Sequence, residues 1–254
     1  MFLVTMIFVT DLFFSLTRSR YFKLYTPMIQ SILHRPGAGG TYAQNLQDDW
    51  VARLAVHNGW VDEGFFLDVG AYSGLWCSNS KLLEERFGWE GLCVEPFPQD
   101  MRGRGCKVVE RVIGSEDDKP VVISGSGQLR TVNIFAGPPT TGSTSILMTT
   151  FPTLLKSNNV PKFINFISLD VEGQELPSLL TFPFEEYEVG AWIIENGSRK
   201  RGGEAIVNLL RSNGYRFRDV ENAGVDGYYV KDKFWMKDLL KKASREHPPG
   251  SWSC

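Results

Sequence analysis

The stretch that most constrains the fold is residues 65–74, Phe-Phe-Leu-Asp-Val-Gly-Ala-Tyr-Ser-Gly. Phe65 to Val69 have the apolar character of a short buried β-strand. Gly70 and Gly74 predict a turn at which the backbone can approach a ligand closely. A helix is expected from about Ser78. This succession of strand, glycine turn and helix is how a Rossmann-like domain builds a nucleotide pocket.

The acid in this stretch, Asp68, indicates what kind of ligand the pocket takes. A carboxylate in this place repels a phosphate group and attracts a cation. S-adenosylmethionine (SAM) carries an ammonium and a sulfonium group, and it fits such a pocket. A nicotinamide dinucleotide is disfavoured, because its pyrophosphate would meet Asp68 and the third glycine of Gly-x-Gly-x-x-Gly is absent.

A second predicted strand, 91–95, ends in another acid, Glu95, which stands 21 residues beyond Gly74. An acid at this spacing can accept hydrogen bonds from both ribose hydroxyls of an adenosyl group. Pro96 ends the strand. The alternative is an α/β domain whose acids only cap helices.

The whole chain alternates between strand-like and helix-like segments, which predicts an α/β fold with a mostly parallel sheet. The closing pair of strands predicts an antiparallel strand at one edge. Residues 114–148 are expected to form a functional loop or flap with one strand at 120–124. The strands are expected at 65–69, 91–95, 107–113, 163–169, 189–194, 215–220 and 227–230, and the helices at 44–57, 82–87, 151–157, 174–180, 204–212 and 234–245.

The chain of 254 residues is long enough for one large α/β domain. A linker at Pro36–Gly40 predicts three parts: an apolar extension and linker at 1–40, the domain at 41–245 and a tail at 246–254. The net charge of −2 gives no electrostatic reason to expect a nucleic-acid partner.

Residues 2–16 are strongly apolar but are interrupted by Asp11. A spanning helix needs about 20 apolar residues, and the basic residues follow this segment, whereas a signal peptide has them in front. Two interpretations stay open: a docking helix or a misplaced start site, and a targeting segment or membrane anchor.

The four cysteines show neither metal-type pairing nor a disulfide framework. Cys93 is interpreted as a small buried apolar residue. We therefore expect a reducing, cytoplasmic location, with a membrane-anchored or secretory-pathway protein as the alternative given by residues 2–16.

Acids stand where four of the predicted strands end, and these ends face the ligand crevice of such a sheet. Buried carboxylates are costly without partners. Asp170, Glu172 and Glu195 have three interpretations: a general base for a hydroxyl, ligands of a divalent cation, or helix caps. No Asp/Glu/His spacing supports a metal, so no metal ligand is predicted. The strand-end acids are Asp68, Glu95, Asp170 and Glu195, and Glu172 follows close behind the third of them.

Taken together, several segments resemble the FkbM-type methyltransferases over about residues 42–230. The chain departs from the family pattern in two places: Tyr72-Ser73 replaces the middle glycine of the common turn, and Asn196-Gly197 follows Glu195 where many members carry His-Asn. The segments that carry the resemblance are 42–48, 65–74, 78–80, 88–96 and 166–176.

The resemblance implies a SAM-dependent enzyme with the Rossmann-like class I methyltransferase fold. It implies methyl transfer to a hydroxyl of a sugar or small metabolite, with a small-molecule acceptor as partner. The alternative is a catalytically inactive protein that keeps the fold as a binding scaffold. The predicted cofactor-binding residues are Asp68, Gly70, Ala71, Tyr72, Gly74, Asn79, Glu95, Val112 and Asp170, and the predicted catalytic residues are Asp170, Glu172 and Glu195.

Overall fold

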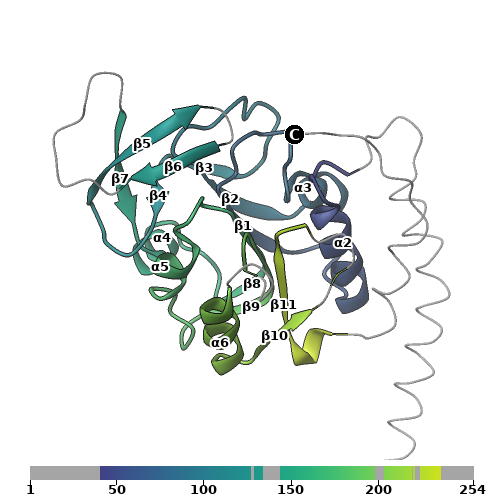
Figure 1. The fold of residues 1–254 in the computed structure, drawn as a ribbon. Coiled ribbons are helices and arrows are strands. Elements are labelled where there is room, and N and C mark those ends of the chain that lie inside the picture. Colours follow the sequence, from purple (N-terminus) through teal and green to yellow (C-terminus); the bar gives the residue numbers. More distant parts are fainter. Residues whose placement is uncertain are drawn as a thin grey trace, which may run out of the picture. The chain divides into compact units, whose positions relative to one another are not determined.

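The computed structural model describes residues 41–126, 129–133, 144–197, 203–218, 220 and 224–235 (Figure 1). Its helices are α2 (Gln47–Asn58), α3 (Lys81–Phe87), α4 (Phe151–Ser157), α5 (Glu175–Leu179), α6 (Glu204–Ser212) and the 3₁₀ helix η2 (Asp232–Phe234). Its strands are β1 (Phe65–Val69), β2 (Glu90–Val94), β3 (Lys107–Val109), β4 (Val112–Ile113), β5 (Pro120–Ser126), β6 (Leu129–Asn133), β7 (Thr144–Thr149), β8 (Phe163–Leu169), β9 (Glu188–Ile194), β10 (Tyr215–Arg218) and β11 (Gly227–Lys231).

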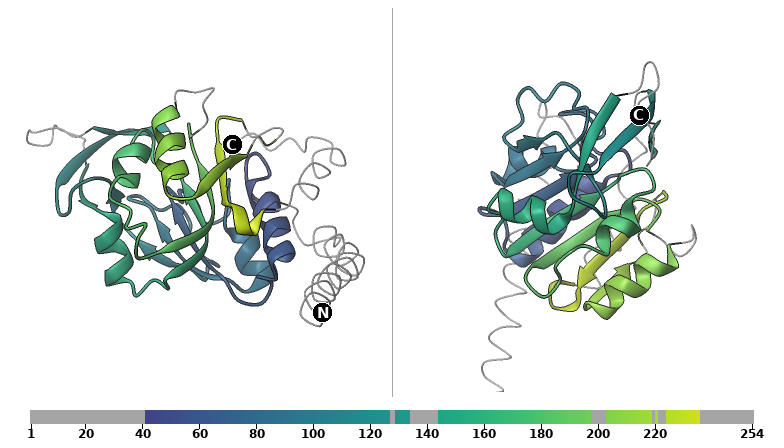
Figure 2. Two further views of the ribbon diagram at one scale, coloured as in Figure 1. Left: turned by 90° about the horizontal axis from the view of Figure 1, so that it is seen from below. Right: turned by 90° about the vertical axis from the view of Figure 1, so that its left-hand side faces the viewer.

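The main sheet has seven strands in the order β10-β11-β9-β8-β1-β2-β3. The five strands from β9 to β3 are parallel, and β11 and β10 are antiparallel additions at one edge. Figures 1 and 2 show α2 and α3 on one face of the sheet and α4, α5 and α6 on the other. The predicted Rossmann-like fold, with a mostly parallel sheet and an antiparallel edge strand, is confirmed.

Helices on both faces explain why the central strands are continuous apolar runs. Every residue of β8 and β9 after the first is buried. The ring of Trp192, on β9, packs against Phe151 of α4 and against Phe182, and it is fully buried. Such burial fixes the relative height of the strands, because a shift would separate Trp192 from the rings against which it packs.

The register of these strands brings their ends to one level. Gly70 donates its N–H to the carbonyl of Val94, and Asp170 donates to Val69. The last paired residues of the four central strands are Val69, Val94, Leu169 and Ile194. The residues that follow them directly are Gly70, Glu95, Asp170 and Glu195. In the sheet, β2 and β3 lie on one side of β1, and β8 and β9 lie on the other. The chain thus reverses the direction of its crossovers between β1 and β8, and the ligand crevice of an open α/β sheet lies at such a point.

The described residues between 112 and 149 differ from the expected irregular loop. They form a second sheet in the order β4-β7-β5-β6, in which β5 pairs antiparallel with β6 and β7. The predicted strand 107–113 is split, because β3 belongs to the main sheet and β4 to the second one. Antiparallel pairing joins segments that look like separate loops when the sequence is read locally, so the pattern predicted β5 and the residues of β4 but missed β6 and β7.

Cysteine pairing also differs from the prediction. Cys93 and Cys106 form a disulfide with their Cα atoms 5.9 Å apart. The parallel pairing of Cys93 with Val108 brings the chain just before β3 alongside β2, and spacing along the sequence gave no sign of this contact. The interpretation of Cys93 as an unpaired apolar residue is wrong, and the expected reducing compartment loses the observation on which it rested.

The localisation prediction also needs correction. Within the described ranges, no helix has both the length and the apolar character needed to cross a membrane. The disulfide removes the argument for a cytoplasmic location, and residues 2–16, which gave the membrane-anchored alternative, lie outside the described residues. The chain divides into two compact units, Met1–Thr41 and Tyr42–Cys254. The predicted boundaries at 1–40, 41–245 and 246–254 stay a prediction, as does most of the helix expected at 234–245.

The segment that enters α2 contains a fully buried acid, Asp48. Its carboxylate accepts hydrogen bonds from the backbone N–H groups of Tyr42, Ala43 and Asp49. Burial nevertheless raises the pKa of Asp48 from 3.8 to about 7. Between about pH 4 and 7 the native state therefore keeps a proton on Asp48 that the unfolded chain has released. The free energy of unfolding must fall as the pH rises through this range.

We expect the free energy of unfolding to fall by up to about 1.4 kcal/mol per pH unit on account of this one group. Asp48→Asn cannot titrate, and it should lose that part of the slope, whatever its absolute stability. Urea unfolding of both proteins at intervals between pH 4.5 and 8 measures the two slopes. Equal slopes would contradict the assignment.

Candidate active site

A cavity of about 360 Å³ opens at the carboxyl ends of the central strands, within the size range of small-molecule sites. Every predicted site residue except Gly74 lines it. The sequence prediction thus gathers into one place, although the roles given to these residues stay predictions.

Two glycines of the turn after β1 do different things. Gly70 has φ +87°, and a Cβ atom there would lie 1.6 Å from the carbonyl oxygen of Asp170. It lets the end of β1 pass beside the end of β8. A Cβ atom on Gly74 would lie 2.4 Å from the carbonyl oxygen of Asp100, so Gly74 is a packing glycine that lies outside the cavity wall.

Glu95 holds the turn in place from β2. Its carboxylate accepts hydrogen bonds from the backbone N–H groups of Tyr72 and Phe97, both at 2.9 Å. Tyr72 has φ +43°, a left-handed conformation that is unfavourable for a bulky residue and that often occurs at functional sites. A carboxylate has about four acceptor positions, and these two bonds orient the Glu95 carboxylate on the cavity wall.

Asp68 is buried at 3% exposure beneath the turn. It accepts a hydrogen bond from the hydroxyl of Ser80. Burial raises the pKa of Asp68, and the positive charge of Arg104 opposes that rise. The sequence analysis looked to a cationic ligand for the partner of this acid, but the protein already supplies a positive charge next to it.

Two buried acceptor atoms on the cavity wall have no hydrogen-bond partner among the described residues. They are Oδ1 of Asn79 and Oε2 of Glu195. The amide group of Asn79 is oriented by its bond to the Ser168 hydroxyl at 2.9 Å. Buried acceptors without partners are costly, and a ligand that carries N–H or O–H donors would satisfy them.

Three acids lie close together near the ends of β8 and β9. Carboxylate oxygens of Asp170, Glu175 and Glu195 lie within 4.8 Å of one another. The pKa of Asp170 is raised well above its usual range, first because the surrounding protein atoms displace water and next because Glu195 carries like charge. Asp170 is nevertheless open to the cavity on one side. The pKa of Glu195 is also raised by burial, although its hydrogen bond with Asp170 opposes the rise. Such a pair titrates as a unit that shares one proton.

Glu175 gives part of this cluster a structural role in the loop before α5. Its carboxylate accepts hydrogen bonds from the backbone N–H groups of Val171 and Gly173, and so it fixes the loop that carries Glu172. Glu172 has φ +52° and also lines the cavity. Whether the cluster holds a metal stays untested.

Sequence reasoning missed other residues of the site. Gln44, Gln47 and Arg111 line the cavity, and Gln47 donates to the carboxylate of Asp226 at 2.8 Å. This bond ties α2 to the start of β11 across 179 positions of sequence. Gln44 and Gln47 stood in a segment that resembles the family, which was the one available signal. For Arg111 and Asp226, local patterns offered none.

The fold and the cavity define a Rossmann-like α/β protein with a small-molecule site at the carboxyl edge of its sheet. The Methyltransferase FkbM domain profile matches residues 68–217, which is more than half of the chain, and the chain belongs to this family. The comparison with solved structures found precorrin-6y C5,15-methyltransferase from Geobacter metallireducens GS-15 at 11% identity, covering 74% of this chain and 86% of that chain, with a TM-score of 0.39. A likeness at that score carries no argument about this chain. No curated protein matches the chain.

Proposed function

We propose that this methyltransferase uses SAM and transfers its methyl group to a hydroxyl oxygen of a sugar or another small metabolite. The observation that carries the proposal is the alignment of Gly70, Glu95, Asp170 and Glu195 at one level of the sheet, around one cavity. Bound SAM supplies an electrophilic methyl group on a positively charged sulfur.

The residues near β1 and β2 fit that cofactor. The carboxylate of Glu95 on the cavity wall is an acceptor suited to ribose hydroxyls, and Asn79 offers a buried acceptor to an ammonium group. Val112 provides an apolar wall. Gly70 keeps the space between β1 and β8 free of a side chain.

The acids near β8 and β9 fit a hydroxyl acceptor. A hydroxyl loses its proton as its oxygen forms the new bond to carbon, and the pair of Asp170 and Glu195 can accept that proton. Holding the acceptor oxygen in line with the methyl group supplies a large part of the rate. A neutral polyhydroxyl compound suits a wall of carboxylates and side-chain amides better than an anion does.

Calorimetry with SAM and a transfer assay with methyl-labelled SAM test the proposal. We expect SAM to bind and the label to appear as an ether on neutral glycosides or polyols. Label on nitrogen or carbon would refute transfer to oxygen. Binding without transfer to any pooled metabolite would favour the inactive scaffold, and the absence of binding by folded protein would refute the use of SAM.

Glu95→Ala should weaken SAM binding by about 10- to 100-fold, because it removes acceptors for the ribose and releases the amides of Tyr72 and Phe97. Glu90→Ala is the matched control, since Glu90 is an exposed acid at the other end of the same strand. Calorimetry measures the SAM dissociation constants of the two variants and of the wild type. Equal loss in both would argue against a role of Glu95 at the ribose.

A further inference from the structure

A buried cation lies behind the cavity wall. The side chain of Arg104 is 0% exposed and pairs with Glu84, Nε to Oε2, at 2.7 Å. Arg104 does not line the cavity. Taking a guanidinium out of water is costly unless its N–H donors have hydrogen-bond partners. The partners of Arg104 therefore explain why it is buried here.

Two further donors of Arg104 reach the segment just before α3. Its Nη2 donates to the hydroxyl of Ser80 at 2.6 Å, and its Nη1 donates to the hydroxyl of Ser78 at 3.1 Å. Ser80 in turn donates to the carboxylate of Asp68. One hydroxyl thus joins the guanidinium to the acid on the cavity wall.

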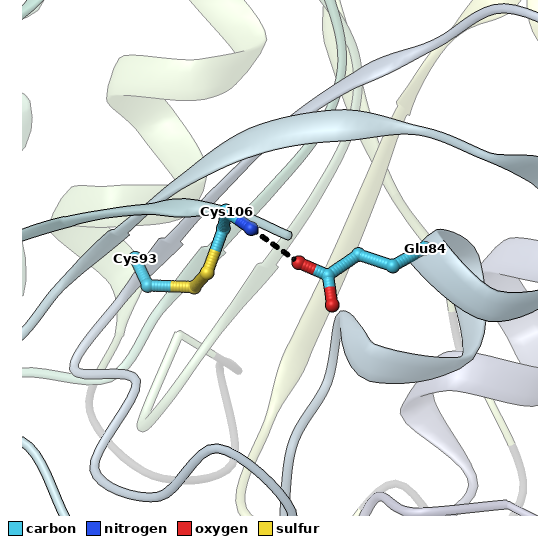
Figure 3. A group of neighbouring side chains, drawn as sticks. All are labelled: Glu84, Cys93 and Cys106. Atoms are coloured by element: carbon cyan, nitrogen blue, oxygen red, sulfur yellow. Dashed lines mark hydrogen bonds between the residues drawn. A yellow bond between two sulfur atoms is a disulfide. The ribbon is translucent and has the colours of Figure 1, made fainter. Parts of the chain in front are cut away.

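The other side of Arg104 is anchored to the disulfide. Glu84 accepts Arg104 on one oxygen and the backbone N–H of Cys106, at 2.8 Å, on the other. Figure 3 shows Glu84 pointing at Cys106, whose sulfur is bonded to that of Cys93 on β2. The disulfide therefore fixes residues 104–106 beside β2, the strand that Glu95 directly follows.

We propose that Arg104 is a positioning residue of the cofactor site, which keeps Asp68 ionised and in place through Ser80. The inference rests on the proposed use of SAM, because an ionised Asp68 favours a cationic ligand. The charged groups that act on Asp68 are Arg104 and Glu84, of which Arg104 lowers the pKa of the acid and Glu84 raises it.

The test is the SAM dissociation constant of Arg104→Met relative to that of the wild type, measured by calorimetry from pH 6 to 9. Without the cation Asp68 should take up a proton more readily, so binding at pH 7 should be about tenfold weaker. The ratio should return toward one as the pH rises and Asp68 ionises. A purely structural role would give a ratio that does not vary with pH.

Arg102→Met is the matched control, because Arg102 lies in the same segment, is 90% exposed and pairs only with the exposed Asp100 among the described residues. Its ratio should stay near one. If Arg104→Met does not fold, the double variant Glu84→Gln, Arg104→Met removes both charges of the buried pair, and it should show a smaller shift in the same direction.

The outcomes separate the two proposals. If wild-type protein binds SAM and the variant matches it at every pH, or is weaker by a constant factor, the role of Arg104 is refuted and the proposed function stands. If the folded wild type does not bind SAM, the proposed function fails and this inference fails with it.

Discussion

Asp170→Asn is expected to lower the rate of methyl transfer by about 10² to 10⁴, the usual contribution of a positioned base, and to leave SAM binding within a few fold. Burial raises the pKa values of both Asp170 and Glu195. The asparagine cannot accept a proton, and it leaves Glu195 as the one member of the pair that can.

The pH profile gives a sharper readout than the rate alone. In the wild type both carboxyl pKa values are raised, so activity should fall as the pH falls through the apparent pKa of the pair. Glu195 raises the pKa of Asp170, whereas the hydrogen bond with Asp170 holds the pKa of Glu195 down. The side-chain amide of an asparagine can still donate to Glu195, so the residual activity of Asp170→Asn, which depends on Glu195, should persist to lower pH than that of the wild type.

Glu185→Gln serves as the control, since Glu185 is an exposed acid ahead of β9. Single-turnover rates with labelled SAM and a saturating acceptor, measured from pH 5 to 9, separate chemistry from binding. If Asp170→Asn keeps the wild-type rate and profile, the pair is not the proton acceptor, and the cluster would be structural, as the bonds of Glu175 already are.

What the sequence could predict follows from the range of the interactions. The strands Phe65–Val69 and Phe163–Leu169 and the helix Phe151–Ser157 have their predicted bounds, because each is a local run whose apolar residues all face the core. The strand-end acids were found for the same reason. A parallel sheet places the carboxyl ends of its strands at one edge. Reading each strand separately was therefore enough to bring Asp68, Glu95 and Asp170 together.

The rest depends on contacts between distant segments. The second sheet arises from the pairing of β5 with β7, and nothing in either segment alone specifies that partner. The disulfide follows from the register of β2 with β3. Arg104 and Asp226 carry no local signal, since one lies in a loop and the other is a single acid before a short strand. Their roles follow from burial and from their hydrogen bonds, Arg104 with Ser80 and Asp226 with Gln47, and these contacts exist only in the folded chain.

Gly70→Ala is expected to abolish measurable SAM binding, a loss of at least about 100-fold, and to destabilise the fold by about 3 kcal/mol or more. Two effects add. A left-handed conformation costs alanine about 1 kcal/mol relative to glycine, and the new methyl group would lie 1.6 Å from the carbonyl oxygen of Asp170. Backbone cannot yield as a side chain can, so β1 or β8 must move, which adds the cost of overpacking.

Gly88→Ala separates these two effects. Gly88 ends α3 at φ +64°, and a Cβ atom there meets nothing within 4 Å. It should lose only the conformational term and bind SAM as the wild type does. Urea unfolding gives the two stabilities, and calorimetry gives the two affinities. If Gly70→Ala behaved like Gly88→Ala in both measurements, the ends of β1 and β8 would not be held at one level by their contact, and the cavity between them would owe its shape to something else.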